Sequence, residues 1–411
     1  MPAPRSPQPA RLLSTLLGLI AFAILSLATS RADAYPWMIR HEYTGCAICH
    51  GDPTGGGVLT PYGRAQGDLL LRTHYSTPKK GEEAGEPSST SGFLWGAFEP
   101  PEWLLAGGSF RGAMLIAKPL TGTAAAPAAA ASFLPILMQA DLRAMIRPSF
   151  LRAGGALGFA HDGGLSAGLT KNASNNVISR EHWIGVGLKD DQFLIRAGRM
   201  NLPFGIRNID HTLWVRKETR TDINTGQQHG VAFAYSGDTL RGEVMGILGN
   251  FQIHPDAYRD RGAVGYLEYT LSPHYTVGVN GLFSTALLDS VTRTTRKRGS
   301  AGIFGRGSPA VPLVLMAEAD MLISAPTLAS VSVGMVGMLQ ADYEPKQGIH
   351  VMGTGEVQVD TSGVAAGGWL GAAWFFLPHV DARVDGILRS VPSPTGATLS
   401  TSFLGQLHFF L

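Results

Sequence analysis

Apolar and polar residues alternate along most of the chain beyond residue 100. The alternation is clearest in segments 275–283, 313–323 and 380–389, and in the last of these Asp381, Arg383 and Asp385 stand between apolar residues. A period of two predicts β-strands with one apolar and one polar face. One such strand fits a soluble sandwich, whose charged face meets water. It fits equally well a membrane barrel, whose apolar face meets lipid.

The same pattern divides the chain beyond residue 100 into about 16 strands. Segment 299–306 alternates weakly and is counted partly because an even number of strands returns both ends of a barrel to one side. Short turns are expected at 148–149, 189–190 and 272–273. The predicted strands are 103–117, 132–146, 149–160, 181–189, 191–200, 229–238, 239–249, 262–271, 274–286, 299–306, 312–323, 327–341, 348–359, 364–377, 380–390 and 401–411. The longer connections are predicted at 118–131, 161–180, 201–228, 250–261, 287–298 and 391–400.

Composition supports strands rather than membrane helices. Of the 411 residues, 45% are hydrophobic, 16% are charged and 52 are glycine. No stretch beyond the N-terminal region has the 18 or more apolar residues of a membrane helix. Glycine at this level favours turns and kinked strands. The formal net charge is only +2, without the strong positive charge typical of nucleic-acid-binding proteins, so no nucleic-acid partner is expected.

The last strand favours the membrane barrel. Phe403, Leu407, Phe409 and Leu411 alternate to the end of the sequence. This resembles the C-terminal assembly signal of bacterial outer-membrane barrels, although the usual final residue there is aromatic. The resemblance implies an all-β, transmembrane antiparallel barrel spanning 101–411, located in the cell outer membrane and in contact with its lipid.

The N-terminal segment has the features of an export signal. Arg5 and Arg11 precede an apolar run from Leu12 to about Leu27, and a small-residue A-x-A site follows at 32–34. We therefore expect residues 1–34 to be a cleaved signal peptide. The alternative is an uncleaved anchor helix, for which the run is short and interrupted by serine and threonine.

The two cysteines of the chain both lie in the sequence Cys46-Ala47-Ile48-Cys49-His50. This spacing predicts one covalent c-type haem: two thiols three positions apart reach the two vinyl groups of one porphyrin. His50 follows as the proximal iron ligand. A redox disulfide or half of a zinc site are the alternatives. The zinc site lacks a second ligand pair, and no βαβ pattern surrounds the motif.

The sixth ligand of the predicted iron is open. No methionine occurs between His50 and Met114, so a downstream methionine at ordinary cytochrome spacing is missing. His74 is the best local candidate, followed by His41 and Met38. A surface histidine, a methionine that packs on the porphyrin, and an open sixth position are the alternatives.

Residues after the motif carry a family resemblance. Leu59, Pro61, Tyr62 and Gly63 resemble the Leu-x-Pro-Tyr/Phe-Gly stretch of the mono-haem segments of porin–cytochrome c fusions, while the glycines at 55–57 depart from it. The resemblance covers about 25 residues. It implies electron transfer across or at the outer membrane. Residue chemistry adds only that Leu59 and Tyr62 can cover a haem face.

Three parts of the chain follow from these patterns. Residues 35–76 form a small haem-bearing segment, 77–100 a linker rich in proline, glycine, lysine and serine, and 101–411 the barrel. A segment of some 40 residues is too small to bury a haem and keep its own core. We therefore expect it to lean on the barrel, on the periplasmic side or inside the lumen.

One predicted connection is rich in basic residues. Segment 196–208 resembles the R-x-G-R…P-F-G stretch of phosphate-selective porins, and the third outer loop of a porin often folds into the lumen. Loop 201–228 also carries Trp214. Its basic residues are Arg207, His211, Arg216, Lys217 and Arg220. These residues predict an anion-selective constriction or, equally, a solvated charged loop. A second basic cluster, 293–298, is expected on the surface.

Two functional hypotheses follow. In the first, the barrel holds one haem and exchanges electrons with periplasmic and extracellular cytochromes, because the hydrocarbon core is about 30 Å thick and one haem does not cross it alone. In the second, an anion-preferring substrate porin uses the haem segment as a redox-sensitive plug or gate. An enzyme is not expected, because no distal catalytic pair, Ser-His-Asp pattern or phosphate loop is evident.

Overall fold

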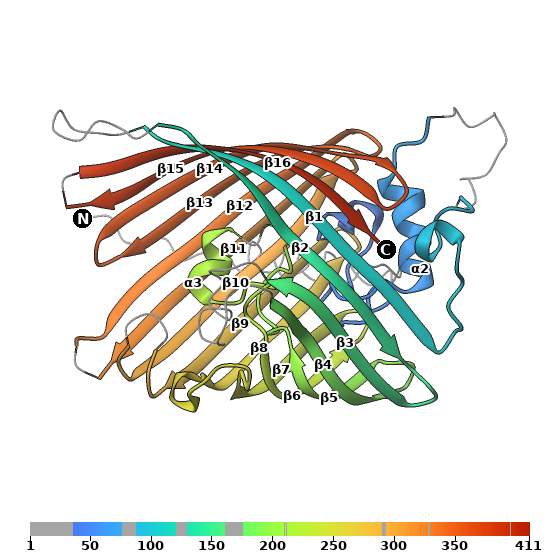
Figure 1. Cartoon of the computed structure of the whole chain (residues 1–411), viewed down its shortest axis with the longest axis horizontal. Helices are drawn as coiled ribbons and strands as arrows, with labels where there is room; N and C mark the ends of the chain where they lie inside the picture. Colours follow the sequence, from blue (N-terminus) through green and yellow to red (C-terminus); the bar gives the residue numbers. More distant parts are fainter. Residues whose placement is uncertain are drawn as a thin grey trace, which may run out of the picture.

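The computed structural model describes residues 36–75, 88–120, 130–160, 176–208, 210, 212–289, 293–327, 329–394 and 396–411. Sixteen antiparallel strands form one closed barrel in which β1 pairs with β2 and with β16 (Figure 1). The predicted signal peptide 1–34 and linker residues 77–87 lie outside the described residues. The strands are β1 (Leu104–Pro119), β2 (Ser132–Ile146), β3 (Leu151–Ala160), β4 (Asn176–Leu188), β5 (Phe193–Met200), β6 (Gln228–Ser236), β7 (Leu240–Gly249), β8 (Arg261–Ser272), β9 (Tyr275–Ala286), β10 (Arg296–Ala310), β11 (Leu313–Pro326), β12 (Ser332–Lys346), β13 (Ile349–Asp360), β14 (Gly363–Leu377), β15 (Val380–Ser393) and β16 (Gly396–Phe410).

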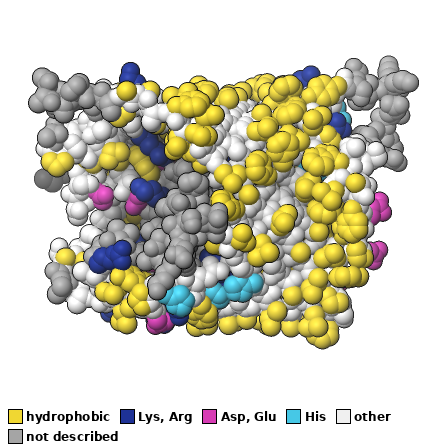
Figure 2. Space-filling model, viewed as in Figure 1, with side chains coloured by type: hydrophobic (Ala, Val, Ile, Leu, Met, Phe, Trp, Pro, Cys, Tyr) yellow, Lys and Arg dark blue, Asp and Glu magenta, His cyan; other side chains and the backbone are white. Residues whose placement is uncertain are grey.

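The alternating residues face as a membrane barrel requires. Val279 and Phe283 on β9 are each 53% exposed on the outside, whereas Glu318 and Asp320 on β11 are buried in the interior. Hydrophobic side chains are numerous along the top and over the right-hand part of the visible face (Figure 2). No helix among the described residues is long and apolar enough to cross a membrane.

Every predicted strand overlaps an observed one, but several ends were predicted wrongly. The strand predicted at 327–341 is β12, Ser332–Lys346, and the weak strand 299–306 is the 15-residue β10. The predicted loop 391–400 is not a loop, because β15 and β16 continue to Ser393 and from Gly396. Pro392 pairs with Ala397 there. The ladder between neighbouring strands sets these ends, and local composition does not reveal it.

The barrel has two unlike ends. Connections 147–150, 189–192, 273–274 and 378–379 are among the short ones at one end, called the turn end below. Longer connections, including 201–227 and 250–260, belong to the opposite, loop end. The short helix η3 (Phe93–Gly96) precedes β1, and Trp95 Nε1 donates a hydrogen bond of 3.0 Å to the Pro378 carbonyl at the turn end.

Residues 36–75, called the plug below, lie inside the barrel and at one of its two open ends (Figure 1). The plug contains three short helices, η1 (Pro36–His41), α2 (Pro61–Gln66) and η2 (Gly67–Leu71). Arg40 Nη1 lies 2.8 Å from Glu344 Oε2 on β12, and the Thr73 amide donates 2.9 Å to the Phe375 carbonyl on β14. Trp37, Met38 and Ile39 are buried in a core shared with the inner faces of strands. The barrel therefore supplies the core that so short a segment cannot form alone.

The third long connection also turns into the lumen. Its helix α3 (Trp214–Thr219) contacts β11, β12 and β13, and Leu213 and Val215 are fully buried. Arg216 Nη2 forms an ion pair with Glu318 of β11. The structure confirms that this connection folds into the lumen, although Lys217 of the same helix is 69% exposed. The anion-selective constriction stays a prediction. His211 lies outside the described residues.

Candidate functional site

The cysteine–histidine motif forms one tight turn within the plug. The backbone amides of Cys49 and His50 donate 3.2 and 3.0 Å hydrogen bonds to the Cys46 carbonyl. Thr60 holds the turn from its other side. Its amide donates a 2.9 Å hydrogen bond to the Cys49 carbonyl, and its hydroxyl donates a 2.6 Å hydrogen bond to the Ile48 carbonyl. The two thiols are buried and not joined in a disulfide. The motif is therefore presented on a fixed backbone.

The glycine run beside the motif has a steric reason. Gly55, Gly56 and Gly57 have φ of 87°, 104° and 70°, a region that side chains disfavour. A Cβ on Gly55 would also stand 3.1 Å from Cys46 Sγ, whereas a Cβ on Gly56 would meet nothing within 4 Å. Gly63 is constrained by space alone, because a Cβ there would collide with the Cys49 carbonyl oxygen. The absence of a side chain at Gly55 therefore avoids a close contact with the Cys46 sulfur.

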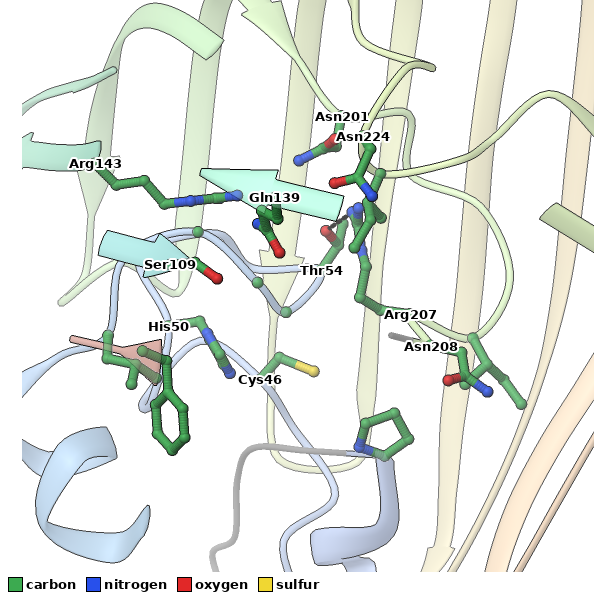
Figure 3. A pocket seen from close by; sticks show the side chains of 18 of the residues that line it. Cys46, His50, Thr54, Ser109, Gln139, Arg143, Asn201, Arg207, Asn208 and Asn224 are labelled. Carbon is green, nitrogen blue, oxygen red and sulfur yellow. Dashed lines mark hydrogen bonds between the residues drawn. The ribbon is translucent and has the colours of Figure 1, made fainter. Parts of the chain in front are cut away.

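Cys46 and His50 open onto a cavity in the lumen, called the central cavity below. It encloses about 1330 Å³, a figure that includes solvent at its open side. The Cys46 thiol and the His50 imidazole project toward the same space, with Thr54 and Arg207 across from them (Figure 3). The walls come from the plug, from loop 201–227 and from the inner faces of β1, β2, β7, β8, β10 and β16.

The wall of the central cavity is strongly basic. Its arginines are Arg111, Arg143, Arg207, Arg241 and Arg306, and Glu268 is the acidic residue among its lining. Arg241 Nη1 lies 2.9 Å from Cys46 Sγ, and Arg306 Nη2 lies 3.0 Å from Glu268 Oε1. Among the described residues, no carboxylate forms an ion pair with Arg111 or Arg207. The cavity therefore offers guanidinium groups without a direct ion pair, although the charge of Arg207 also acts on the buried carboxylate of Asp52. Such groups match the carboxylates of a ligand.

The imidazole of His50 has a shifted pKa. Burial lowers its pKa from 6.5 to about 4, and the opposing effect of Asp52 is smaller. The imidazole is therefore neutral at physiological pH, and a neutral ring nitrogen is a metal ligand.

The structure gathers some of the predicted site residues and not others. Cys46, His50 and Leu59 line the central cavity. Cys49 is fully buried in the core beside it, one turn from Cys46. Tyr62 is 42% exposed, and its hydroxyl lies 3.1 Å from that of Tyr43, away from the cavity lining. His74 is also outside that lining, with Nε2 3.3 Å from the Leu69 carbonyl. The roles predicted for Tyr62 and His74 stay predictions.

The sequence analysis named Arg207 of the cavity wall but missed the arginines that come from strands, which are Arg111, Arg143, Arg241 and Arg306. Arg241 and Arg306 stand on predicted strands, where a charged residue in an apolar alternation faces the lumen. That signal indicates the lumen but not which lumen-facing residues converge at one depth. Convergence depends on the register between strands and on the inward fold of loop 201–227.

Comparisons with known proteins bear on the fold. No protein-family model matches the sequence, and no curated protein matches it. Among solved structures, OmpT of Vibrio cholerae, an outer membrane protein, is similar with a TM-score of 0.56 and 10% identity over 76% of this chain and 99% of that one. The anion-selective porin from Comamonas acidovorans is similar with a TM-score of 0.55 and 11% identity, over 75% of this chain and 99% of that one. The outer membrane channel DcaP of Acinetobacter baumannii is similar with a TM-score of 0.54 and 10% identity, over 76% of this chain and 99% of that one.

These likenesses establish the barrel. The chain has the closed 16-strand antiparallel fold of outer-membrane porins. The alignment with the anion-selective porin covers almost all of that protein, whereas about a quarter of this chain has no counterpart in it.

Proposed function

We propose that this chain is an outer-membrane porin-like barrel that carries one covalent c-type haem in its lumen and transfers electrons at or across the outer membrane. One observation carries the proposal. The Cys46 thiol and the His50 imidazole project into an arginine-lined cavity that is enclosed by a barrel of porin fold.

The exterior of the barrel supports an outer-membrane location. Exposed aromatic side chains lie next to the short connections at the turn end, among them Trp103, Phe150, Tyr275, Tyr343 and Trp374. Aromatic residues at this height form the girdle that membrane barrels place at the lipid–water interface. The apolar strand faces between the two ends then contact outer-membrane lipid. Short connections face the periplasm in such barrels, so the plug enters from that side.

Particular residues would hold the haem. Cys46 and Cys49 would supply the two thioether sulfurs, and His50 the proximal nitrogen. Leu59 would pack against the porphyrin from the cavity wall. Arg111 and Arg207, which have no carboxylate partner among the described residues, would pair with the propionates. A bound haem supplies a one-electron redox centre.

The position of the motif suggests how partners reach it. A smaller pocket, called the inner pocket below, lies at the turn end and is lined by His50, Leu59 and His379. A wide cavity, called the outer vestibule below, lies at the loop end, encloses about 2380 Å³ including open solvent, and is lined by Arg216, Asn224 and Tyr258 among others. The central cavity lies between them. A periplasmic cytochrome is therefore expected at the turn end, and an extracellular cytochrome or other acceptor at the loop end.

The first test is a pyridine haemochrome spectrum of the purified, denatured protein. One haem per chain that stays attached on denaturation supports the proposal. The double variant Cys46→Ala, Cys49→Ala should contain no covalently attached haem. The second test places the protein in sealed liposomes that enclose a reduced cytochrome. Oxidation of the enclosed cytochrome by an external oxidant, dependent on the wild-type motif, is the expected result. Absence of haem, or absence of transfer from a haem-loaded barrel, contradicts the proposal.

The alternative function is an anion-preferring porin that the plug closes in a redox-sensitive way. Its supporting observation is the basic outer vestibule, whose lining includes Arg180, Lys217, Arg298 and Arg389. Several of these charges are already compensated, for example Arg389 Nε by Glu356 at 2.7 Å. The two functions are separated by measuring ion conductance in planar bilayers under oxidising and reducing conditions. A conductance that changes with redox state favours the gated porin.

A further inference from the structure

Strand β2 contains an irregularity at the height of the central cavity. Arg111 pairs with Gln139, and the next residue, Gly112, pairs with Leu137, so Met138 has no partner on β1. This is a β-bulge, in which one extra residue is inserted into a strand. In a regular strand Met138 and Gln139 would face opposite sides of the barrel. Because of the bulge, both line the central cavity.

Met138 and His50 lie at opposite ends of the central cavity. His50 lines both this cavity and the inner pocket at the turn end. Met138 lines both this cavity and the outer vestibule at the loop end. A planar ligand bound between these side chains would have His50 toward the inner pocket and Met138 toward the outer vestibule.

The chemistry of Met138 suits an iron ligand. The thioether sulfur is a soft, uncharged donor, and methionine opposite histidine is an established axial pair for haem iron. Among the described residues, no hydrogen bond occupies the Met138 sulfur. A methionine on a flexible, unbranched side chain adapts its position without moving the strand.

The competing side chains are less suitable. His408 lines the cavity, but its Nδ1 lies 2.8 Å from Asp381 Oδ2 and its Nε2 lies 2.9 Å from Ser109 Oγ, so both ring nitrogens are engaged. Met38 lines the inner pocket with His50, on the same side as the proximal ligand. His74 lines neither the central cavity nor the inner pocket.

We propose that Met138 is the distal axial ligand of the haem iron, placed there by the bulge in β2. This rests on the proposed function, since it requires a haem at His50. It assigns the outer coordination position to the barrel wall and the inner one to the plug. The iron is then held between two parts of the chain that are far apart in sequence.

The test compares Met138→Leu and Met138→His with the wild type in the full-length, purified protein. Leucine keeps the volume and removes the sulfur donor. We expect the ferric methionine–iron charge-transfer band at the red end of the spectrum to disappear, carbon monoxide to bind the reduced protein, and the midpoint potential to fall. Met138→His should restore a six-coordinate spectrum and exclude carbon monoxide, at a potential below that of the wild type.

Controls separate this ligand from its rivals and from haem attachment. Met114→Leu, on the lipid-facing side of β1 and 38% exposed, should leave the band and the potential unchanged. Haem content should be one per chain in all variants, because the thioethers are intact. If Met138→Leu keeps the wild-type band and potential, or if Met38→Leu, His74→Ala or His408→Asn removes them instead, the assignment is wrong although the haem proposal stands. A wild-type protein without haem overturns the proposed function itself.

Discussion

Arg196 of β5 and Asp52 of the plug form a buried ion pair, with Arg196 Nη2 3.2 Å from Asp52 Oδ1. The same nitrogen lies 2.7 Å from Glu243 Oε1 on β7. One guanidinium therefore joins two barrel strands to a plug residue that stands two positions after His50. The arrangement fixes the motif relative to the wall.

Arg196→Met should destabilise the folded protein. It leaves the carboxylates of Asp52 and Glu243 buried without their ion-pair partner, and breaking a buried pair costs about 3–5 kcal/mol. The measurement is urea unfolding of the protein refolded into lipid vesicles. Arg261→Met removes an exposed pair with Asp256 and serves as the control, for which no measurable change is expected. Equal stability of the two variants would show that the buried pair does not anchor the plug.

Gly55→Ala and Gly56→Ala should differ in haem attachment. Both place a side chain at positive φ, which costs on the order of 1–3 kcal/mol. At Gly55 the added Cβ also stands 3.1 Å from Cys46 Sγ, whereas at Gly56 it meets nothing within 4 Å. Covalent haem per chain, measured on denatured protein, should fall only for Gly55→Ala. A similar fall in both variants would assign the effect to backbone strain alone.

Arg111→Gln should lower the midpoint potential of the haem. The reduced centre carries one more electron, so a nearby uncompensated cation stabilises it relative to the oxidised form. A tenfold change in the redox equilibrium corresponds to about 59 mV for one electron, and we expect a shift on that order. Spectroelectrochemical titration measures it. Lys189→Gln, in the exposed turn 189–192, is the control and should leave the potential unaltered. If the wild type, Arg111→Gln and Lys189→Gln all have the same potential, Arg111 does not pair with a propionate.

Arg216→Met should loosen the third long connection. Arg216 pairs with Glu318 and donates to the Phe204 carbonyl at 3.2 Å and to the Thr221 hydroxyl at 3.0 Å. Without these bonds helix α3 loses its charge anchor to β11, and Glu318 stays buried alone. Single-channel recordings should show higher and noisier conductance. The neighbouring Lys217 is 69% exposed, so Lys217→Met is a matched control that should conduct like the wild type.

His379 should make stability depend on pH. It lies in the turn 378–379 outside the strands, and burial lowers its pKa below the usual 6.5. The stability that it contributes is present above pH 6.5 and is lost as pH falls toward the lower pKa of the folded state. His379 has a φ of 63°, which asparagine tolerates. His379→Asn should therefore flatten the decline in unfolding midpoint below pH 6.5, and an unchanged profile would exclude this residue.

Much of the barrel could be predicted from sequence because lipid and lumen impose opposite demands on neighbouring residues. Val279, Phe283 and Glu318 each face the side that the alternation indicates. The ends of strands were less predictable. Segment 396–400 is polar and follows Pro392, which suggests a loop, but pairing with β15 extends β16 to Gly396.

The site was predictable only in its local part. Cys46, Cys49 and His50 follow from spacing, because their chemistry depends on neighbours in sequence. The proposed role of Met138 could not be predicted from sequence, because nothing in the residues around it indicates the bulge that turns it inward. Long-range convergence of this kind depends on the register of two strands.

The central cavity also constrains the order of assembly. Its walls combine plug residues such as Cys46 with His408 and Phe410 of β16, and β16 closes the barrel through hydrogen bonds that include Leu411 to Gly108 at 2.8 Å. Neither the plug nor the strands alone form the cavity. Closure of the barrel and completion of this cavity are therefore one event. If the proposed haem is attached to the plug beforehand, the strands must close around the loaded plug as they insert.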